Sequence, residues 1–203
     1  WSPSAHTVAG NGAPLSWRPS ADAVAGERQE PEPTMRLYRN QGNGTFEDVT
    51  QRAGLAIPLY GMGLVAADYD NNGTQDLLIT GYRETRLLRN EGNGTFIDVT
   101  PQAGIVQGNW DTAAAFVDVD RDGWLDLVIG SYVDWDPAKE ANLDCTYGTP
   151  AKDYCAVKYF HGQGLKLYRN LGDGRFADIS APAGIVAPEA RVLGITIVDY
   201  NQD

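Results

Sequence analysis

Two short segments of the 203-residue sequence place acidic side chains and a glycine at the spacing of a cation-binding loop. Residues 68–76 follow the pattern D-x-D-x-N-G-x-x-D, and residues 118–126 follow D-x-D-x-D-G-x-x-D. Side-chain oxygens at positions 1, 3 and 5 wrap a hard cation, a backbone carbonyl at position 7 adds a ligand, and position 9 closes the shell. The two segments therefore predict two calcium sites.

Each position of the pattern supplies one candidate ligand. The ligands are Asp68, Asp70, Asn72, Thr74 and Asp76 in the first loop, and Asp118, Asp120, Asp122, Trp124 and Asp126 in the second. A third copy, Asp199, Asn201 and Asp203, stops before position 9, so we expect it to be incomplete or free of metal. Magnesium fits less well than calcium because it prefers near-ideal octahedra and keeps its waters. Four carboxylates against three predict tighter binding in the second loop.

Two other interpretations of these loops are available. An EF-hand requires a bidentate Glu at position 12 and flanking helices, but position 12 is Ile79 or Ile129 and the flanks resemble strands, which excludes it. A solvated Asp/Asn/Gly turn without metal is the simpler alternative, and the presence of two aligned copies argues against it.

The loops belong to a longer internal repeat. LYRNQGNGTFEDVTQRAGL at 37–55 recurs as LLRNEGNGTFIDVTPQAGI at 87–105 and as LYRNLGDGRFADISAPAGI at 167–185. The acidic loops recur in the same phase, with Asp118 lying 50 residues after Asp68 and Asp199 lying 81 residues after Asp118. The repeat unit is therefore about 50 residues, with about 30 residues inserted in one copy.

Each unit is expected to contain four short antiparallel strands, for example Leu64–Ala67, Leu77–Thr80, Arg86–Arg89 and Thr95–Thr100. Four strands in about 50 residues is the size of one β-propeller blade. We expect an all-β fold of propeller-type four-stranded blades that form an incomplete ring in this chain. The expected units are 35–60, 61–105, 112–185 with an insertion at 131–163, and a truncated unit at 192–203. Residues 1–34 are expected to form an extended arm or linker.

Composition limits the partners. Lys and Arg total 16 and Asp and Glu total 27, so the formal net charge is −11 and the sequence pI is near 4.5. This charge argues against nucleic acid and anionic membrane surfaces as partners, and it favours cations. No apolar run approaches the ~20 residues of a membrane span. The N-terminus lacks the basic and apolar regions of a signal peptide, so we expect a signal to have been removed or never to have been present.

The expected insertion contains the two cysteines, Cys145 and Cys155. A disulfide between them is the favoured prediction. A metal or redox pair is the weaker alternative, because no C-x-x-C motif is present and His161 is the sole histidine nearby. A disulfide implies an extracellular or cell-surface location, with the periplasm as another possibility. The three Asn-Gly-Thr sequons at Asn43, Asn72 and Asn93 match a glycosylation signal, but the turns or the metal require the same residues.

Aromatic residues gather in the third unit and its insertion. Burial in a core is the more frequent role of such residues, while Trp135, Tyr154 and Tyr159 are candidates for a platform that binds a ligand. Nothing favours catalysis, because neither His6 nor His161 lies in a nucleophile motif and the paired carboxylates are explained by calcium. We therefore expect that the protein is not an enzyme.

The combination of D-x-D-x-D-G-x-x-D, L-Y-R-N, G-x-G-x-F and D-V-T over residues 35–203 resembles the FG-GAP or VCBS repeats of calcium-binding β-propellers. Integrin α-subunit heads carry such repeats, and the extracellular proteins that join FG-GAP repeats to an ASPIC/UnbV module are the closer match. The resemblance implies calcium on the hairpins, secretion, and roles in adhesion or matrix contact.

We accordingly expect an extracellular calcium-binding repeat protein that acts in adhesion, surface binding or assembly. Its partner would be a protein, a surface glycan or a second copy that pairs with an open blade edge. Insertion into a membrane is not expected. The alternative function is a propeller-fold lectin or a polysaccharide lyase or hydrolase.

Overall fold

The computed structural model describes residues 35–108, 110–146, 154–185 and 187–200. These residues all belong to the larger of two units, Glu32–Asp203. The expected arm at 1–34 lies outside the described residues, as do Asn201 and Asp203 of the third acidic segment.

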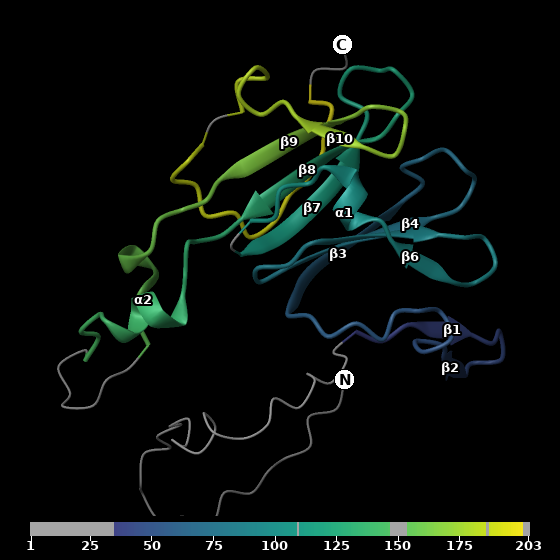
Figure 1. Cartoon of the computed structure of the whole chain (residues 1–203), viewed down its shortest axis with the longest axis horizontal. Helices are drawn as coiled ribbons and strands as arrows, with labels where there is room; N and C mark the ends of the chain where they lie inside the picture. Colours follow the sequence, from purple (N-terminus) through teal and green to yellow (C-terminus); the bar gives the residue numbers. More distant parts are fainter. Residues whose placement is uncertain (1–34, 109, 147–153, 186, 201–203) are drawn as a thin grey trace, which may run out of the picture. The chain divides into compact units, whose positions relative to one another are not determined.

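The described residues form two four-stranded antiparallel sheets and one hairpin (Figure 1). The first sheet contains β3 (Gly61–Ala67), β4 (Asp76–Gly81), β5 (Arg86–Asn90) and β6 (Phe96–Asp98), and the second contains β7 (Asp111–Val117), β8 (Asp126–Ser131), β9 (Leu165–Asn170) and β10 (Phe176–Asp178). Strands β1 (Tyr38–Asn40) and β2 (Phe46–Asp48) form the hairpin. The strands of each sheet pair in sequence order, and the described residues do not form a closed ring. The predicted fold class, all-β with propeller-type blades and an incomplete ring, is confirmed.

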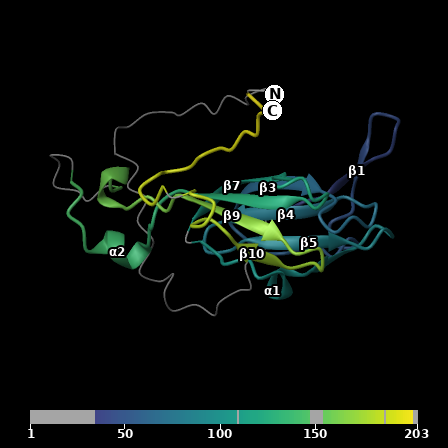
Figure 2. The ribbon, with the colours of Figure 1, turned by 90° about the horizontal axis from the view of Figure 1, so that it is seen from above.

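The two sheets pack through β3 and β7, which lie side by side in both ribbon views (Figures 1 and 2). Gly63 makes this approach possible, because a Cβ built there would lie 2.7 Å from the carbonyl oxygen of Thr112 and 2.8 Å from Oγ1 of Thr80. Apolar side chains from both sheets fill the space between them: Tyr69, Leu78, Leu87, Ala103, Ile105, Leu127, Ile129, Tyr168 and Phe176. Burial of this shared core holds the sheets together.

A second core lies on the other face of the first sheet. Ala53, Leu55 and Leu59, which follow the β1–β2 hairpin in sequence, pack against Ile79 and Leu88. Ala103 and Ile105 are the repeat equivalents of Ala53 and Leu55, and they lie in the core between the sheets. The segment that precedes each sheet therefore packs on one face of that sheet.

The D-V-T motif joins the two outer strands of each repeat. Thr100 Oγ1 accepts the Leu87 N–H at 2.9 Å, and Oδ1 of Asp98 accepts the N–H of Thr100 at 3.0 Å and its hydroxyl at 2.6 Å. The same contacts recur in Leu37, Asp48 and Thr50, and in Leu167, Asp178 and Ser180. Burial alone would raise the pKa of Asp98. The hydrogen bonds from Thr100 and the ion pair with Arg86 outweigh burial, so the pKa of Asp98 lies below its usual value. The motif therefore stabilises the charged carboxylate.

The same motif ends the last strand earlier than the sequence suggested. The expected strand at 95–100 is shorter in the structure, where β6 ends at Asp98 and helix α1 (Thr100–Ala103) follows. The Asp98 side chain accepts the Thr100 N–H and so fixes a turn at the end of the strand, and Pro101 in the first turn favours the helix.

Residues between β8 and β9 form an excursion that leaves the ladder of the second sheet intact. It contains helix α2 (Pro137–Ala141) and the 3-10 helix η2 (Val157–Tyr159), both away from the sheets in Figure 1. A disulfide joins Cys145 to Cys155, as predicted. Glu140 also crosses the excursion, because it accepts the indole N–H of Trp135 at 2.7 Å and the backbone N–H of Cys155 at 2.9 Å.

Residues 187–200, where the first strand of a further unit was expected, contain no strand. This segment lies against the second sheet, where the Val192 N–H donates to the Ser131 carbonyl at 3.1 Å and the Val192 carbonyl accepts the Thr112 hydroxyl at 2.6 Å. A strand requires a partner strand, and the described residues beyond β10 provide none.

Replacing Thr100 by Val will destabilise the protein by about 1–3 kcal/mol, because the buried Leu87 N–H loses its acceptor while the side-chain volume is kept. Urea unfolding measures the change. Thr100→Ser keeps the hydroxyl and is the matched control, with an expected loss of less than about 1 kcal/mol. Equal stability of the Val variant and the unchanged protein would contradict this role of the motif.

Candidate metal-binding loops

The two acidic loops are the hairpin turns between the first two strands of each sheet. The first joins β3 to β4 and the second joins β7 to β8, so both lie at the same end of neighbouring sheets. In each loop three carboxylates converge, with one oxygen of each lying within 4.8 Å of the others: Asp68, Asp70 and Asp76, and Asp118, Asp120 and Asp126. The structure thus brings six of the predicted side-chain ligands into two groups.

The backbone of each loop is wound around its first aspartate. Asp68 accepts the N–H groups of Asn72 at 3.0 Å and Gly73 at 2.9 Å, and Asp118 accepts those of Asp122 at 3.1 Å and Gly123 at 3.0 Å. This winding requires a left-handed backbone at Gly73, where φ is 88°. The glycine in the pattern is therefore needed for the loop geometry.

The aspartate at position 9 is fully buried in both loops. Asp76 accepts the Asn90 N–H at 2.7 Å and the Tyr69 N–H at 3.3 Å, which orients its carboxylate toward the loop. Burial raises the pKa of Asp76 to about 6, and repulsion from Asp70 and Asp68 adds to the rise although both N–H groups oppose it. A nearby cation would relieve this unfavourable charge.

The position-5 side chains face a different partner. Asn72 Oδ1 accepts the Thr74 N–H at 2.8 Å, and Asp122 Oδ1 accepts the Trp124 N–H at 2.9 Å. Asp122 is not a member of the converging carboxylate group. The carbonyl ligands expected from Thr74 and Trp124 stay a prediction.

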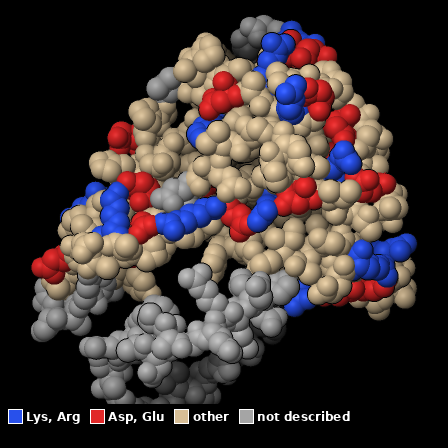
Figure 3. Space-filling view, viewed as in Figure 1, with Lys and Arg blue, Asp and Glu red and all other residues tan. Residues whose placement is uncertain are grey.

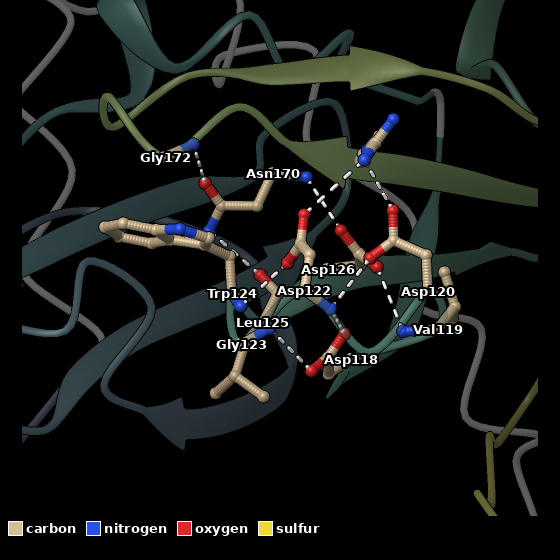
Figure 4. A network of polar contacts seen from close by, with 11 residues as sticks. Asp118, Val119, Asp120, Asp122, Gly123, Trp124, Leu125, Asp126, Asn170 and Gly172 are labelled. Carbon is tan, nitrogen blue, oxygen red and sulfur yellow. Dashed lines mark hydrogen bonds and ion pairs between the residues drawn. The ribbon is translucent and has the colours of Figure 1, made fainter.

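The donor set fits a hard divalent cation. Every converging group is a carboxylate oxygen, and oxygen-only sites suit calcium, magnesium and manganese. Figure 4 shows the second loop, in which the side chains of Asp118, Asp120 and Asp126 lie close together. Backbone N–H groups fix the Asp118 and Asp126 carboxylates. Each loop can therefore hold one metal ion, with Asp68, Asp70 and Asp76 or Asp118, Asp120 and Asp126 as ligands. Asp199, from the third acidic segment, is exposed.

Asn170, which was not among the predicted site residues, connects the two loops. Its side-chain amide donates to the Leu125 carbonyl at 3.0 Å and, in the other sheet, to the Tyr69 carbonyl at 2.9 Å. Its backbone N–H donates to Asp126 at 2.8 Å. Tyr69 lies between two carboxylates of the first loop, so a single buried residue links both candidate sites. The recurrence of Asn in every L-Y-R-N motif was the available signal.

The loops also touch directly. The Asn71 side-chain amide donates to the Gly123 carbonyl at 3.1 Å. Asn71 itself has a φ of 54°, a conformation that Asn tolerates better than most residues. The two sites thus form one continuous region at the edge of the sheets.

The residues proposed as an aromatic platform occupy different surroundings. Trp135 packs with Tyr82 and Trp110, at ring-centroid distances of 5.2 and 5.6 Å. Tyr154 and Tyr159 are 72% and 43% exposed. Trp135 therefore belongs to an aromatic cluster beyond the ends of β4 and β8 opposite the acidic loops, and the two tyrosines lie on the surface of the excursion.

The Asn-Gly-Thr sequons all form the same turn. The side-chain oxygens of Asn43 and Asn93 accept the N–H groups of Thr45 and Thr95, each at 3.0 Å, as Asn72 does with Thr74. These asparagines therefore have a structural role in the hairpins.

Acidic and basic side chains are interspersed on the face that Figure 3 shows, with no broad area of one sign. In the part of the chain that the structure describes, neither helix has the length and apolar composition to span a membrane.

Comparison with known proteins gives one family. A family model described as FG-GAP-like repeat matches residues 20–79 and 68–129, which together cover more than half of the 203 residues. No curated protein matches the sequence.

Asn170→Ala will destabilise the protein by about 2–4 kcal/mol, because the Tyr69, Leu125 and Gly172 backbone groups each lose a hydrogen-bond partner. Asn90→Ala is the matched control at the same repeat position. Asn90 bonds only to Gln75 and Gly92 through its side chain, both within its own sheet, so we expect about 1–2 kcal/mol. Chemical unfolding of the two variants makes the comparison, and equal losses would argue against the bridge between sheets.

Proposed function

Because the chain belongs to the FG-GAP-like repeat family, we propose that it is an extracellular calcium-binding repeat protein that acts in adhesion, surface binding or assembly. The observation that carries this proposal is the convergence of three carboxylates at the same hairpin of two consecutive blades. Repetition at equivalent positions is expected of a structural metal site that each blade requires.

Calcium is the proposed ion on chemical grounds. The loops offer converging carboxylates, with the backbone carbonyls of Thr74 and Trp124 as further predicted ligands. Calcium accepts six to eight oxygens in irregular geometry. Millimolar extracellular calcium would fill even weak sites. In this role the metal neutralises the acidic loops and fixes the hairpins that project from the sheets.

The Cys145–Cys155 disulfide supports a location outside the cytoplasm, because such bonds persist in oxidising compartments. Cell surface, extracellular space and periplasm all satisfy this condition, and calcium favours the first two.

Binding or assembly is supported by an apolar surface on the first sheet. Within the described residues β3 pairs only with β4. Met62 and Leu64 on β3 are exposed, as is Tyr60 directly before it. A groove runs along this surface, lined by Met35, Leu59, Tyr60, Gly61, Met62, Gly63, Leu64 and Ile79. An edge strand with apolar neighbours can accept another sheet or a second copy of this chain. We propose a role in binding, without catalysis.

Calcium is expected to raise the melting temperature, and EDTA to lower it, because each ion removes repulsion among three carboxylates. Differential scanning calorimetry measures the shift. Asp70→Asn and Asp120→Asn should each lose part of the calcium effect, and the double variant should lose nearly all of it. Asp173→Asn, at an acidic residue in a turn without a converging group, is the control and should keep the full effect. An unchanged melting temperature in EDTA would exclude structural calcium.

Calcium-dependent self-association or surface binding is expected to weaken in Leu64→Lys, because the charge opposes burial of the apolar surface on β3. Sedimentation and binding to immobilised glycans and matrix proteins test this, with Thr95→Lys on an exposed turn as the control. Glycan binding that Leu64→Lys leaves intact would favour the lectin alternative. Release of reducing or unsaturated ends from polysaccharides would favour the enzyme.

A further inference from the structure

A cationic side chain from β9, Arg169, contacts the second loop. Nη2 of Arg169 lies 2.7 Å from Oδ2 of Asp120 and 3.5 Å from Oδ2 of Asp122. Asp120 belongs to the converging carboxylate group, so the guanidinium contacts a predicted metal ligand directly.

The equivalent arginine of the first sheet turns to another partner. Arg89 occupies the same place in the L-x-R-N motif, but its Nε and Nη2 donate to Glu91 at 2.9 and 2.8 Å. Position 91 is Glu in the first sheet, whereas the matching position in the second sheet is Leu171, which is exposed and cannot pair with an arginine. The residue two places after the arginine thus decides where the guanidinium points.

This difference changes the charge balance of the loops. The first loop has three aspartates, and Arg89 and Glu91 beside it cancel, which leaves a formal charge of −3. The second loop has four aspartates, but Arg169 and Arg121, which occupies the place of Asn71, reduce its formal charge to −2. Counting carboxylates alone therefore gives the wrong order of negative charge.

We propose that Arg169 is an internal counter-ion of the second loop that competes with the divalent cation for Asp120, so that the first loop is the higher-affinity site. This inference rests on the proposed calcium function. It reverses the order that the four acidic residues of the second loop suggest.

Binding of a divalent cation to the second loop requires the exchange of one ion for another. A cation that enters the second loop must break the contact between Arg169 and Asp120 and then lie near a displaced positive charge. In the first loop Glu91 holds the guanidinium in place, and the carboxylate groups stay available. Without metal the order of stabilisation is reversed. Arg169 contacts Asp120 directly and relieves repulsion in the second loop, whereas Arg89 is paired with Glu91 and acts on Asp70 only at longer range.

Calorimetric titration of the whole protein with calcium, with one loop at a time disabled by substitution, tests the proposal. Asp70→Asn silences the first loop and Asp120→Asn silences the second. We expect the first loop to bind more tightly. In the Asp70→Asn background, Arg169→Gln should tighten the second loop about tenfold, since a unit positive charge near a divalent ion is removed in a partly solvated site.

Exchanging the residue types at positions 91 and 171 tests the mechanism without replacing either arginine. Leu171→Glu should also tighten the second loop, and Leu171→Gln is the control that adds no charge. In the Asp120→Asn background, Glu91→Leu should weaken the first loop by releasing Arg89 toward Asp70. Unchanged affinity in Arg169→Gln, or tighter binding by the second loop of the unmodified protein, would overturn the proposal.

A readout without calcium separates the two proposals. In EDTA, Arg169→Gln should lower the melting temperature more than Arg89→Gln, because Arg169 contacts a converging carboxylate directly and Arg89 does not. If no variant binds calcium but this difference is present, the proposed function is wrong and the counter-ion role stands. If calcium binds and the difference is absent, the counter-ion role is wrong and the proposed function stands.

Discussion

Repulsion among carboxylates held close together is the constraint on which the hairpins of this protein depend. Three aspartates at each loop have oxygens within 4.8 Å of one another, and the position-9 aspartate is fully buried. Backbone N–H groups offset part of this electrostatic repulsion, because the turn winds around Asp68 or Asp118 and directs its N–H groups at that carboxylate. These N–H groups carry only partial positive charges and leave the negative charge of the carboxylates unbalanced. A bound cation would therefore stabilise the loop further. The fold and the proposed metal therefore stabilise the same conformation.

Hydrogen bonds of short polar side chains connect the acidic loops to the sheets. Asp76 is held by the N–H of Asn90, and Asp126 by that of Asn170, so each buried carboxylate is fixed by the end of a strand in its own sheet. Asn170 then reaches across to the Tyr69 carbonyl in the neighbouring sheet. The aromatic and aliphatic core supplies most of the burial between sheets, while these bonds set the register in which the loops meet.

The sequence was sufficient for features that repeat and insufficient for features that differ between repeats. Four-stranded units, the hairpin loops and the Cys145–Cys155 bridge follow from spacing and turn chemistry. The end of β6 at Asp98 was missed because a side chain, and not a change in hydrophobic pattern, ends the strand. The link from Asn170 to Tyr69 spans 101 residues, and no local pattern reports a contact that depends on how two sheets pack. The positions expected for metal carbonyls and the third acidic segment stay predictions.

Differences between repeats show where the blades diverge in role. The first sheet keeps Glu91 beside its arginine and presents an apolar surface along β3, whereas the second has Leu171 and carries the disulfide-bonded excursion between β8 and β9. A ladder that runs unbroken past the excursion shows that the sheet tolerates extra chain at this connection, because the flanking strands stay paired from Leu127 to Gly130. The two loops have the same backbone geometry. The change from Glu91 to Leu171 beside them therefore alters the charge around a loop without altering the shape of that loop. Repetition thus fixes the fold, and single substitutions at the loop edge change the ion pairs that surround each acidic loop.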